Sequence, residues 1–359
     1  MAMTIEELQQ KQERLNPMDA DIYRAVLHHW DSLAKPLDGL GDYERLVARI
    51  GGIQRTDHPA VDKRVLLVFL SDNGIVEEGV SQSDASVTLA VAEAMRLGNS
   101  TVCVMAKEAD VDVHPVDVGM QSFHISGIEN RRVRKGTRNF LREPAMTVRE
   151  TLAAIDAGYQ VAKQAGRDGY KVLLLGEMGI GNTTTATAIG CVLLGVDPLE
   201  VTGRGAGLSE ERLERKCAVI EEAIQRYQYD DEDALEVLSL FGGYDIAAMV
   251  GVIIAGAEEH LPVVVDGLIT LSAVLVAERL FPSIKDVCIA SHRPKEPMGR
   301  MLLSELGFEA PIDANLALGE GTGAVLLMPQ VDVAMALYDH GSRFEGIGMQ
   351  AYQRYKERS

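Results

Sequence analysis

The sequence contains little cysteine: only four occur among 359 residues, at Cys103, Cys191, Cys217 and Cys288. None belongs to a CxxC pair, and three lie in apolar or helical contexts. This pattern is typical of reduced structural thiols, so we predict a cytoplasmic protein. Long apolar runs are missing as well, since none reaches the roughly 18 residues that a membrane helix needs. The acidic, polar start has no signal-peptide core.

Positive charge is also scarce, with 35 Lys and Arg against 53 Asp and Glu and a formal net charge of −18. Such a surface repels nucleic acid and anionic membranes, so we expect neither as a partner. An anionic substrate would therefore have to be captured by local groups. The eight histidines form no ligand cluster in the sequence, and we predict no metal and no cofactor.

Short aliphatic runs alternate with helical patterns from residue 61 onward. Each run suits a strand buried on both faces; the clearest are RVLLVFL, KVLLLG, LPVVV and DVCIA, at residues 64–70, 171–176, 261–265 and 286–290. The alternation predicts an α/β fold with a doubly wound, mostly parallel sheet in a Rossmann-like three-layer arrangement.

Polar and amphipathic helices are predicted at both ends of the chain, at residues 5–15, 21–34, 43–54 and 330–357. We expect them to form a smaller helical lobe beside the sheet. The predicted division is therefore an N-terminal helical lobe at 1–60, an α/β domain at 61–328, and C-terminal helices at 329–359 that return to the lobe.

Five Gly- or Ser-rich loops are candidates for ligand binding, because ligands of such sheets bind beyond the carboxyl ends of the strands. They are SDNGIVEEGVS, GEMGIGNTTT, GRGAGLS, ASHRPKEPMG and LGEGTGA. The second fits seven of the eight columns of the ATP-loop pattern G-x-x-x-x-G-K-[ST], but it has Asn182 in place of the lysine. Asn182 cannot bridge terminal phosphates, and Glu177 adds a carboxylate, so an ATP loop is disfavoured. A monophosphate cradle without a metal remains, and a tight turn without a ligand fits this stretch alone equally well.

Two further loops carry candidate residues. Arg204 lies among glycines just before a helix predicted to begin near Ser209, which suggests that a phosphate is held from two sides. Lys216, about two turns into that helix, reads by itself as a solvated lysine. Glu320 lies between two glycines and two apolar runs; apolar surroundings raise a carboxyl pKa, which suits a general base. A turn residue that points to water is the alternative.

Taken together, the motifs resemble those of the nicotinate-nucleotide–dimethylbenzimidazole phosphoribosyltransferase family. The resemblance rests on GEMGIGNTTTA, GRGAGL with a downstream RK, SH…EPMG and LGEGTGA, and it extends from about residue 34 to 348. It implies a glycosyltransferase (a pentosyltransferase) that moves the phosphoribosyl group of nicotinate mononucleotide to a lower-ligand base such as 5,6-dimethylbenzimidazole. The products would be nicotinate and the α-ribotide used in cobalamin-type cobamide assembly. A dimer is also implied.

The resemblance assigns roles to individual residues. Glu320 would be the general base, and the implied catalytic group is Glu320, Glu177 and Lys216. The implied phosphate and nucleotide contacts are Gly176, Gly179, Gly181, Asn182, Thr183, Gly203, Arg204, Gly205 and Ser291. The implied base pocket is Pro36, Leu40, Ser83, Val91, Met178 and Leu318. The pyridinium of the donor leaves without a general acid, and Glu177 would stabilise positive charge that develops on the ribose.

The sequence departs from the family at the acceptor side. Many members have His at the position of Asn73 and a Gln-rich helix where this chain has TLAVAEAMRLGN, which includes the apolar Val91. Some relatives accept phenol or p-cresol and work as heterodimers of homologous subunits. The sequence therefore leaves open a benzimidazole-accepting enzyme, a phenol-accepting homologue and a non-catalytic partner subunit. Retention of Glu320, Glu177 and Lys216 counts against the last.

Overall fold

The computed structural model describes residues 3–12 and 15–355. Within these residues six strands form one sheet in the order β3-β2-β1-β4-β5-β6, and every neighbouring pair is parallel. The strands are β1 Arg64–Ser71, β2 Asp112–Gly119, β3 Glu129–Asn130, β4 Val172–Met178, β5 Val263–Val265 and β6 Cys288–Ala290. The prediction of a doubly wound parallel sheet is confirmed.

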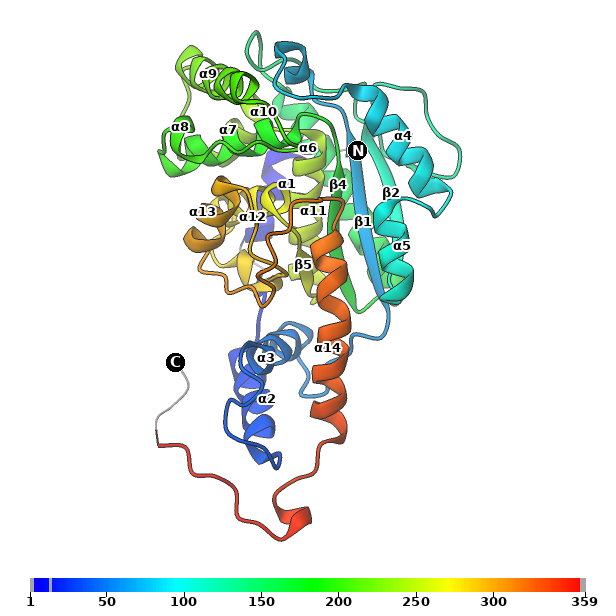
Figure 1. The fold of residues 1–359 in the computed structure, drawn as a ribbon, viewed down its shortest axis with the longest axis vertical. Coiled ribbons are helices and arrows are strands. Elements are labelled where there is room, and N and C mark those ends of the chain that lie inside the picture. The colour runs from blue at the N-terminus through cyan, green and yellow to red at the C-terminus, as the bar shows by residue number, and fades with distance from the viewer. Residues whose placement is uncertain (1–2, 13–14, 356–359) are drawn as a thin grey trace.

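Helices cover both faces of the sheet (Figure 1). On β1, Leu67 and Phe69 point into one apolar core, and Leu66 and Val68 point into the other. The first core is closed by α6 Val148–Arg167, α7 Asn182–Leu194, α10 Ala234–Phe241, α11 Tyr244–Glu259, α12 Leu268–Leu280 and α13 Pro297–Glu305. The second is closed by α4 Ala85–Arg96, α5 Thr101–Glu108 and α14 Thr322–His340. Burial on both faces explains why the strands read as continuous aliphatic runs.

Capping residues that can be recognised in the sequence fix the starts of two helices, α6 and α9. Thr147 and Glu150 form a capping box at the start of α6, with Glu150 N donating to Thr147 Oγ1 at 3.2 Å and Thr147 N to Glu150 Oε2 at 2.8 Å. Ser209 caps α9 Glu210–Arg226, as expected. The short α8 Pro198–Val201 precedes α9. A 3₁₀ helix, Gly74–Glu78, follows β1.

The strand order places a switch point between β1 and β4. From β1 the chain continues to β2 and β3 on one side, and from β4 it continues to β5 and β6 on the other. The loops that leave the carboxyl ends of β1 and β4 therefore diverge and open a crevice, which is where such sheets bind ligands.

The small lobe lies at the amino ends of the strands and contains α2 Ala20–Ser32, α3 Asp42–Gln54 and the end of α14 (Figure 1). The buried Trp30 ring packs edge-on against Tyr338 of α14, with ring centroids 5.1 Å apart. Because α14 continues from the sheet into the lobe, the predicted boundary at residue 328 falls within one helix. A division into a sheet domain and a helical lobe stays a proposal.

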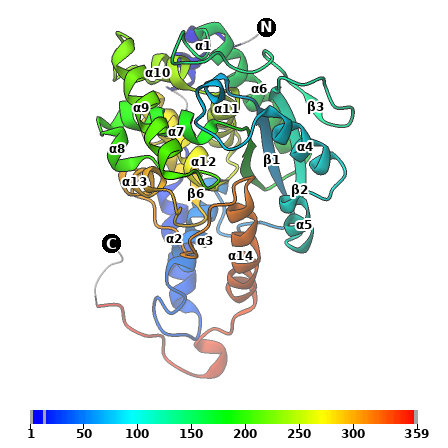
Figure 2. The same cartoon turned by 45° about the horizontal axis from the view of Figure 1, so that its top comes forward.

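The two ends of the chain do not form the part of the helical lobe that was predicted for them. Helix α1, Ile5–Gln12, lies away from α2 and α3 (Figure 2), and Lys11 pairs with Glu258 of α11 at 2.7 Å. The predicted C-terminal helix ends at His340, and beyond it only a 3₁₀ turn, Glu345–Ile347, forms in the described residues. Three glycines between 341 and 348 weaken helical propensity there, so the prediction of helix beyond 340 was wrong. Residues 13–14 and 356–359 of the predicted terminal helices lie outside the described residues.

No helix in the described part of the chain has the length and apolar character to cross a bilayer.

Candidate active site

A cavity of about 330 Å³ opens at the carboxyl ends of the central strands. All five candidate loops contribute to its wall, through Val80 and Ser81, residues 177–183, residues 204–206 and 208, residues 292 and 294–296, and residues 316–320 and 322. The wall also contains Val87 and Val91 of α4 and the start of α12. Loops that are far apart in the sequence therefore meet at the switch point, as the fold requires.

Helix starts supply positive potential to this cavity. The N-cap residues of α7 and α12 are Gly181 and Gly267, and neither helix has a side-chain cap. In α7 the N–H groups of Asn182 and Thr184 already donate to the carbonyl oxygens of Gly179 and Gly181. The absence of a side-chain cap and the positive end of each helix dipole still favour an anion such as a phosphate. Gly181 has φ of 95°, and a Cβ there would lie 2.7 Å from Val76 Cγ2, so glycine is required at this turn.

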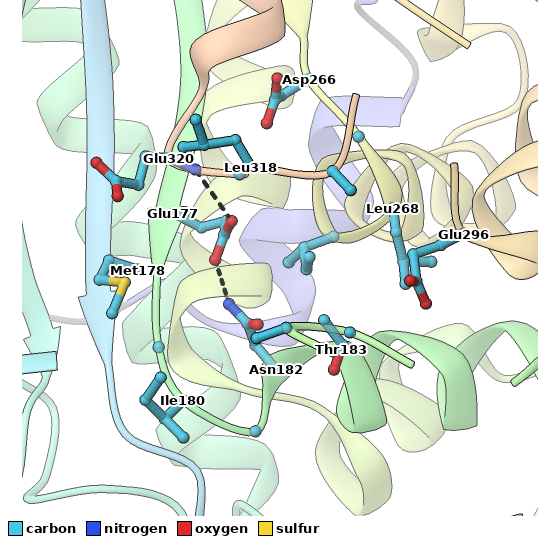
Figure 3. A pocket seen from close by; sticks show the side chains of 18 of the residues that line it. Glu177, Met178, Ile180, Asn182, Thr183, Asp266, Leu268, Glu296, Leu318 and Glu320 are labelled. Atoms are coloured by element: carbon cyan, nitrogen blue, oxygen red, sulfur yellow. Dashed lines mark hydrogen bonds between the residues drawn. The ribbon is translucent and has the colours of Figure 1, made fainter. Parts of the chain in front are cut away.

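Glu177 is the last residue but one of β4 and is almost completely buried. One of its carboxylate oxygens accepts a hydrogen bond from the Asn182 side chain, and the other lies 3.4 Å from the Glu320 backbone nitrogen (Figure 3). Burial and the nearby Asp245 carboxylate raise the pKa of Glu177 to about 8. Its surroundings therefore favour the protonated form of this carboxyl more than water does.

Glu320 lies in a loop whose backbone is held in an unusual conformation. Its φ is +59°, in the left-handed region that non-glycine residues rarely adopt, and both neighbouring glycines also have positive φ. Its Oε2 atom is buried and has no hydrogen-bond partner among the described residues. Burial raises the pKa of this carboxyl. An unpaired carboxylate oxygen with a raised pKa is suited to accept a proton.

Gly176 does not line the cavity. It lies within β4, where a Cβ would be 2.6 Å from the Glu320 carbonyl oxygen. The expectation that Gly176 contacts phosphate is therefore not met; the missing side chain instead lets the Glu320 loop lie directly on the strand.

Lys216 is fully buried on α9. Its Nζ donates to Thr183 Oγ1 at 3.1 Å and to the Gly203 carbonyl oxygen at 3.2 Å. Burial lowers the pKa of Lys216 to about 8. The interpretation of a solvated helix lysine is wrong, and so is direct contact with the cavity, which Lys216 does not line. It braces the two loops predicted to hold the phosphate from behind.

The remaining predicted residues separate into two groups. The cavity wall contains Gly179, Gly181, Asn182, Thr183, Arg204, Gly205, Ser83, Val91, Met178 and Leu318. The wall does not contain Gly203, Ser291, Pro36 or Leu40. Ser291 is buried behind His292, with its Oγ 3.0 Å from His292 Nδ1. Pro36 and Leu40 belong to the segment between α2 and α3 in the lobe, at the other end of the sheet. Within one chain, the expectation that they contact the base is therefore not met.

Sequence reasoning missed the roles of three carboxylates, of which Asp245 and Asp266 are buried and Glu296 is half-buried. Asp266 follows β5 and accepts hydrogen bonds from Gly323 N at 2.7 Å and Gly321 N at 3.3 Å, so it holds the start of α14. Glu296 lies across the cavity from Glu320 (Figure 3), and its Oε2 is buried without a partner among the described residues. Asp245 contacts Asn182 from α11. The sequence contains the motifs VDG, EPMG and GGYD around these residues, but the spacing of the motifs along the chain does not indicate what the carboxylates do.

The fold and the site together define a class. An α/β protein with a pocket at its switch point, open helix starts and several buried carboxylates is built to hold a phosphorylated sugar and to transfer protons or stabilise positive charge beside it.

The chain belongs to the family described as "Phosphoribosyltransferase", whose model matches residues 15–348. It is 37% identical over 329 residues to the nicotinate-nucleotide–dimethylbenzimidazole phosphoribosyltransferase of Clostridium perfringens, covering 91% of both chains. It is 38% identical over 338 residues to the enzyme of the same name from Acetivibrio thermocellus, covering 94% of this chain and 95% of that one. The crystal structure so named from Thermus thermophilus has a TM-score of 0.86 at 35% identity, covering 93% of this chain and 99% of that chain. The family resemblance read from the motifs is confirmed.

Proposed function

We propose that this phosphoribosyltransferase transfers the phosphoribosyl group of nicotinate mononucleotide to 5,6-dimethylbenzimidazole. The products are nicotinate and the α-ribotide that enters the nucleotide loop of cobamides. The observation that carries the proposal is the junction of Glu177 and Glu320 at the switch-point cavity, beside helix starts that suit a monophosphate. The names of the relatives, which contain both nicotinate nucleotide and dimethylbenzimidazole, support the two substrates.

The donor phosphate is placed at the start of α7. Asn182 and Thr183 line the cavity there, and Arg204 lies on the wall nearby. Lys216 fixes the Thr183 hydroxyl and the Gly203 carbonyl, so its role is to position this loop rather than to touch the phosphate. Glu296 offers an unpaired, buried oxygen that suits a ribose hydroxyl donor.

The transfer itself needs one base and no acid. A nitrogen of the acceptor attacks C1′ while the C1′–N bond to nicotinate breaks, and the electron pair of that bond neutralises the pyridinium. Ionised Glu177 stabilises the positive charge that develops on the ribose. The second ring nitrogen of the acceptor then gives its proton to Glu320, whose buried Oε2 is unoccupied by other described groups.

The acceptor side of the cavity is apolar, with Val87, Val91, Met178 and Leu318 in its wall. This wall suits the flat ring and methyl groups of dimethylbenzimidazole. It also supports phenol or p-cresol as a second acceptor class, because their rings need no polar partner beyond a base for the hydroxyl proton. Such phenolic acceptors would give a phenolic cobamide precursor.

A dimer is part of the proposal. Helix α14 has an exposed apolar row formed by Leu326, Val333 and Leu337, and Val333 is 71% exposed. The spacing places these side chains on one face of the helix. On α5, which packs beside α14, Val104 is also exposed, by 58%. A second copy of the chain, or a homologous subunit, would cover this surface.

The test is a direct assay of the purified chain with nicotinate mononucleotide and each of dimethylbenzimidazole, adenine, phenol and p-cresol. We expect nicotinate and an α-ribotide in equal amounts, with dimethylbenzimidazole the best acceptor. Activity of the chain alone excludes a non-catalytic subunit. No nicotinate release, while a relative is active under the same conditions, would refute the proposal.

A further inference from the structure

The side chain of Asn182 lies between two buried carboxylates. Its Nδ2 donates one hydrogen bond to Glu177 Oε2 and another to Asp245 Oδ2, the second at 3.1 Å. The three side chains come from the start of α7, the end of β4 and the first turn of α11. All three residues are buried, and Asp245 has no exposed surface at all. The position that holds lysine in an ATP loop thus holds an amide bridge.

The two carboxylates fix which way the amide points. An amide nitrogen carries two hydrogens and its oxygen carries none, so the nitrogen must face two carboxylate acceptors. Glu177 is held at its other oxygen by the backbone nitrogen of Glu320, 3.4 Å away. A continuous connection therefore runs from Asp245 through Asn182 and Glu177 to the loop of the general base (Figure 3 shows its last two links).

Asp245 cannot reach a ligand directly, because it is not part of the cavity wall. Two glycines enclose it: a Cβ at Gly179 would lie 3.3 Å from Asp245 Oδ2, and one at Gly243 would collide with Oδ1. The Oδ1 atom has no side-chain or backbone partner among the described residues that meets hydrogen-bond geometry. Nearby backbone N–H groups of Ile246 and of Asp245 itself lower the pKa of this carboxyl, but a fully buried carboxylate is still costly for the fold. Its presence beside the active site points to a role in function.

We propose that Asp245 is a positioning residue of the transfer reaction, which acts through the Asn182 amide to set the orientation and charge of Glu177. This inference rests on the proposed function, because it assigns Glu177 the stabilisation of the ribosyl cation. Asp245 does not line the cavity, so contacts with the substrate would not reveal its role.

The charges around the Asn182 amide determine in which direction Asp245 shifts the pKa of Glu177. Burial and Asp245 raise the pKa of Glu177, and Asp266 raises it further, whereas the hydrogen bond from Asn182 lowers it. Burial and the neighbouring Asp72 raise the pKa of Asp245, and Asn182 again lowers it. Burial and mutual repulsion therefore disfavour two negative charges on this pair. A bound pyridinium ring draws Glu177 into its ionised form, so donor binding releases a proton.

The first test is Asp245→Asn, which keeps the size of the side chain and removes its charge. We measure kcat/KM for nicotinate mononucleotide against pH, with Asp62→Asn, an exposed residue in the loop before β1, as the matched control. The acid limb of this pH profile is the range in which activity falls because Glu177 becomes protonated. It is expected to move to lower pH by on the order of one unit, because the variant lacks the like charge that raises the pKa of Glu177. The same change in a Glu177→Gln background is expected to produce no shift.

The second test is Asn182→Ala, which remains informative if Asp245→Asn does not fold. Loss of the amide removes a bond that favours ionised Glu177, so the acid limb is expected to move to higher pH, opposite to the first variant. Thermal melts of all variants separate folding defects from shifts of the limb. Active variants whose limbs stay in place, or move in the same direction, would overturn the inference. An inactive wild-type protein would instead refute the proposed function.

Discussion

The backbone nitrogen of Glu320 lies 3.4 Å from the Glu177 side chain, although the two residues are 143 positions apart in the sequence. The contact joins the end of β4 to the loop before α14. It places the group proposed to take a proton beside the group proposed to stabilise positive charge. Gly176 makes this approach possible because a Cβ there would lie 2.6 Å from the Glu320 carbonyl oxygen.

Replacing Glu320 by alanine tests the general base. The variant is expected to bind nicotinate mononucleotide nearly as the parent does but to turn over ~10²-fold or more slowly, the usual effect of losing a general base. Turnover is measured by nicotinate release and donor binding by calorimetry. Turnover close to that of the parent would contradict the assigned role.

Replacing Gly176 by alanine tests the packing of the same loop. The added methyl group must displace the Glu320 backbone, and small displacements of catalytic groups slow a reaction strongly, so we expect at least about a tenfold loss of kcat. Gly346→Ala is the matched control, because a Cβ there meets nothing within 4 Å and φ is not positive. Equal kcat values for the two variants would show that the close contact is unimportant for the reaction.

Glu177 makes stability depend on pH in a definite direction. Its pKa in the folded protein is about 8, above its ordinary value of 4.5, so the folded state binds more protons than the unfolded state between these two values. Stability contributed by the protonated carboxyl is therefore lost as pH rises from about 5 to 8. Glu177→Gln should raise the Tm relative to the parent by about 3 °C or more at pH 8.5 and by less at pH 5. Melting curves at both pH values check this, and an equal difference at both would contradict it.

Lys216→Met keeps most of the buried volume and removes the charge. The Gly203 carbonyl and the Thr183 hydroxyl lose their donor, which costs about 1–3 kcal/mol for an unsatisfied buried group. We therefore expect a lower Tm. If the same free energy is lost from donor binding, the KM for nicotinate mononucleotide rises about tenfold. Arg226→Met, at the exposed end of the same helix, serves as the control. An unchanged KM in the Lys216 variant would separate this lysine from donor binding.

The exposed row on α14 predicts a change of assembly. Val333→Glu introduces a charge at its most exposed residue and is expected to convert a dimer into monomers, as measured by light scattering after gel filtration. Asp339→Lys, elsewhere on the exposed surface of the helix, provides a charge-changing control. If the parent chain is itself a monomer, the proposed dimer is refuted.

Much of the fold was predictable because its signals are local. The aliphatic runs gave the strands β1, β4, β5 and β6, and Thr147 with Glu150 gave the start of α6. The short helices α10 and α13 were missed because their patterns are brief. The helix predicted beyond His340 failed because periodicity was extended across glycines that end it.

The sequence by itself determined the α/β class, the glycine-rich loops and the family, since these depend on residue types and spacing along the chain. Only the tertiary structure decided what each residue does. It moved Gly176 from the phosphate site to a backbone contact, placed Lys216 behind the cavity wall, and left Pro36 and Leu40 in the lobe. It also brought Asp245 to Asn182 across 63 positions. The physical reason is that charge, burial and hydrogen bonding at a site depend on neighbours in space, which parallel strands bring together from distant parts of the chain.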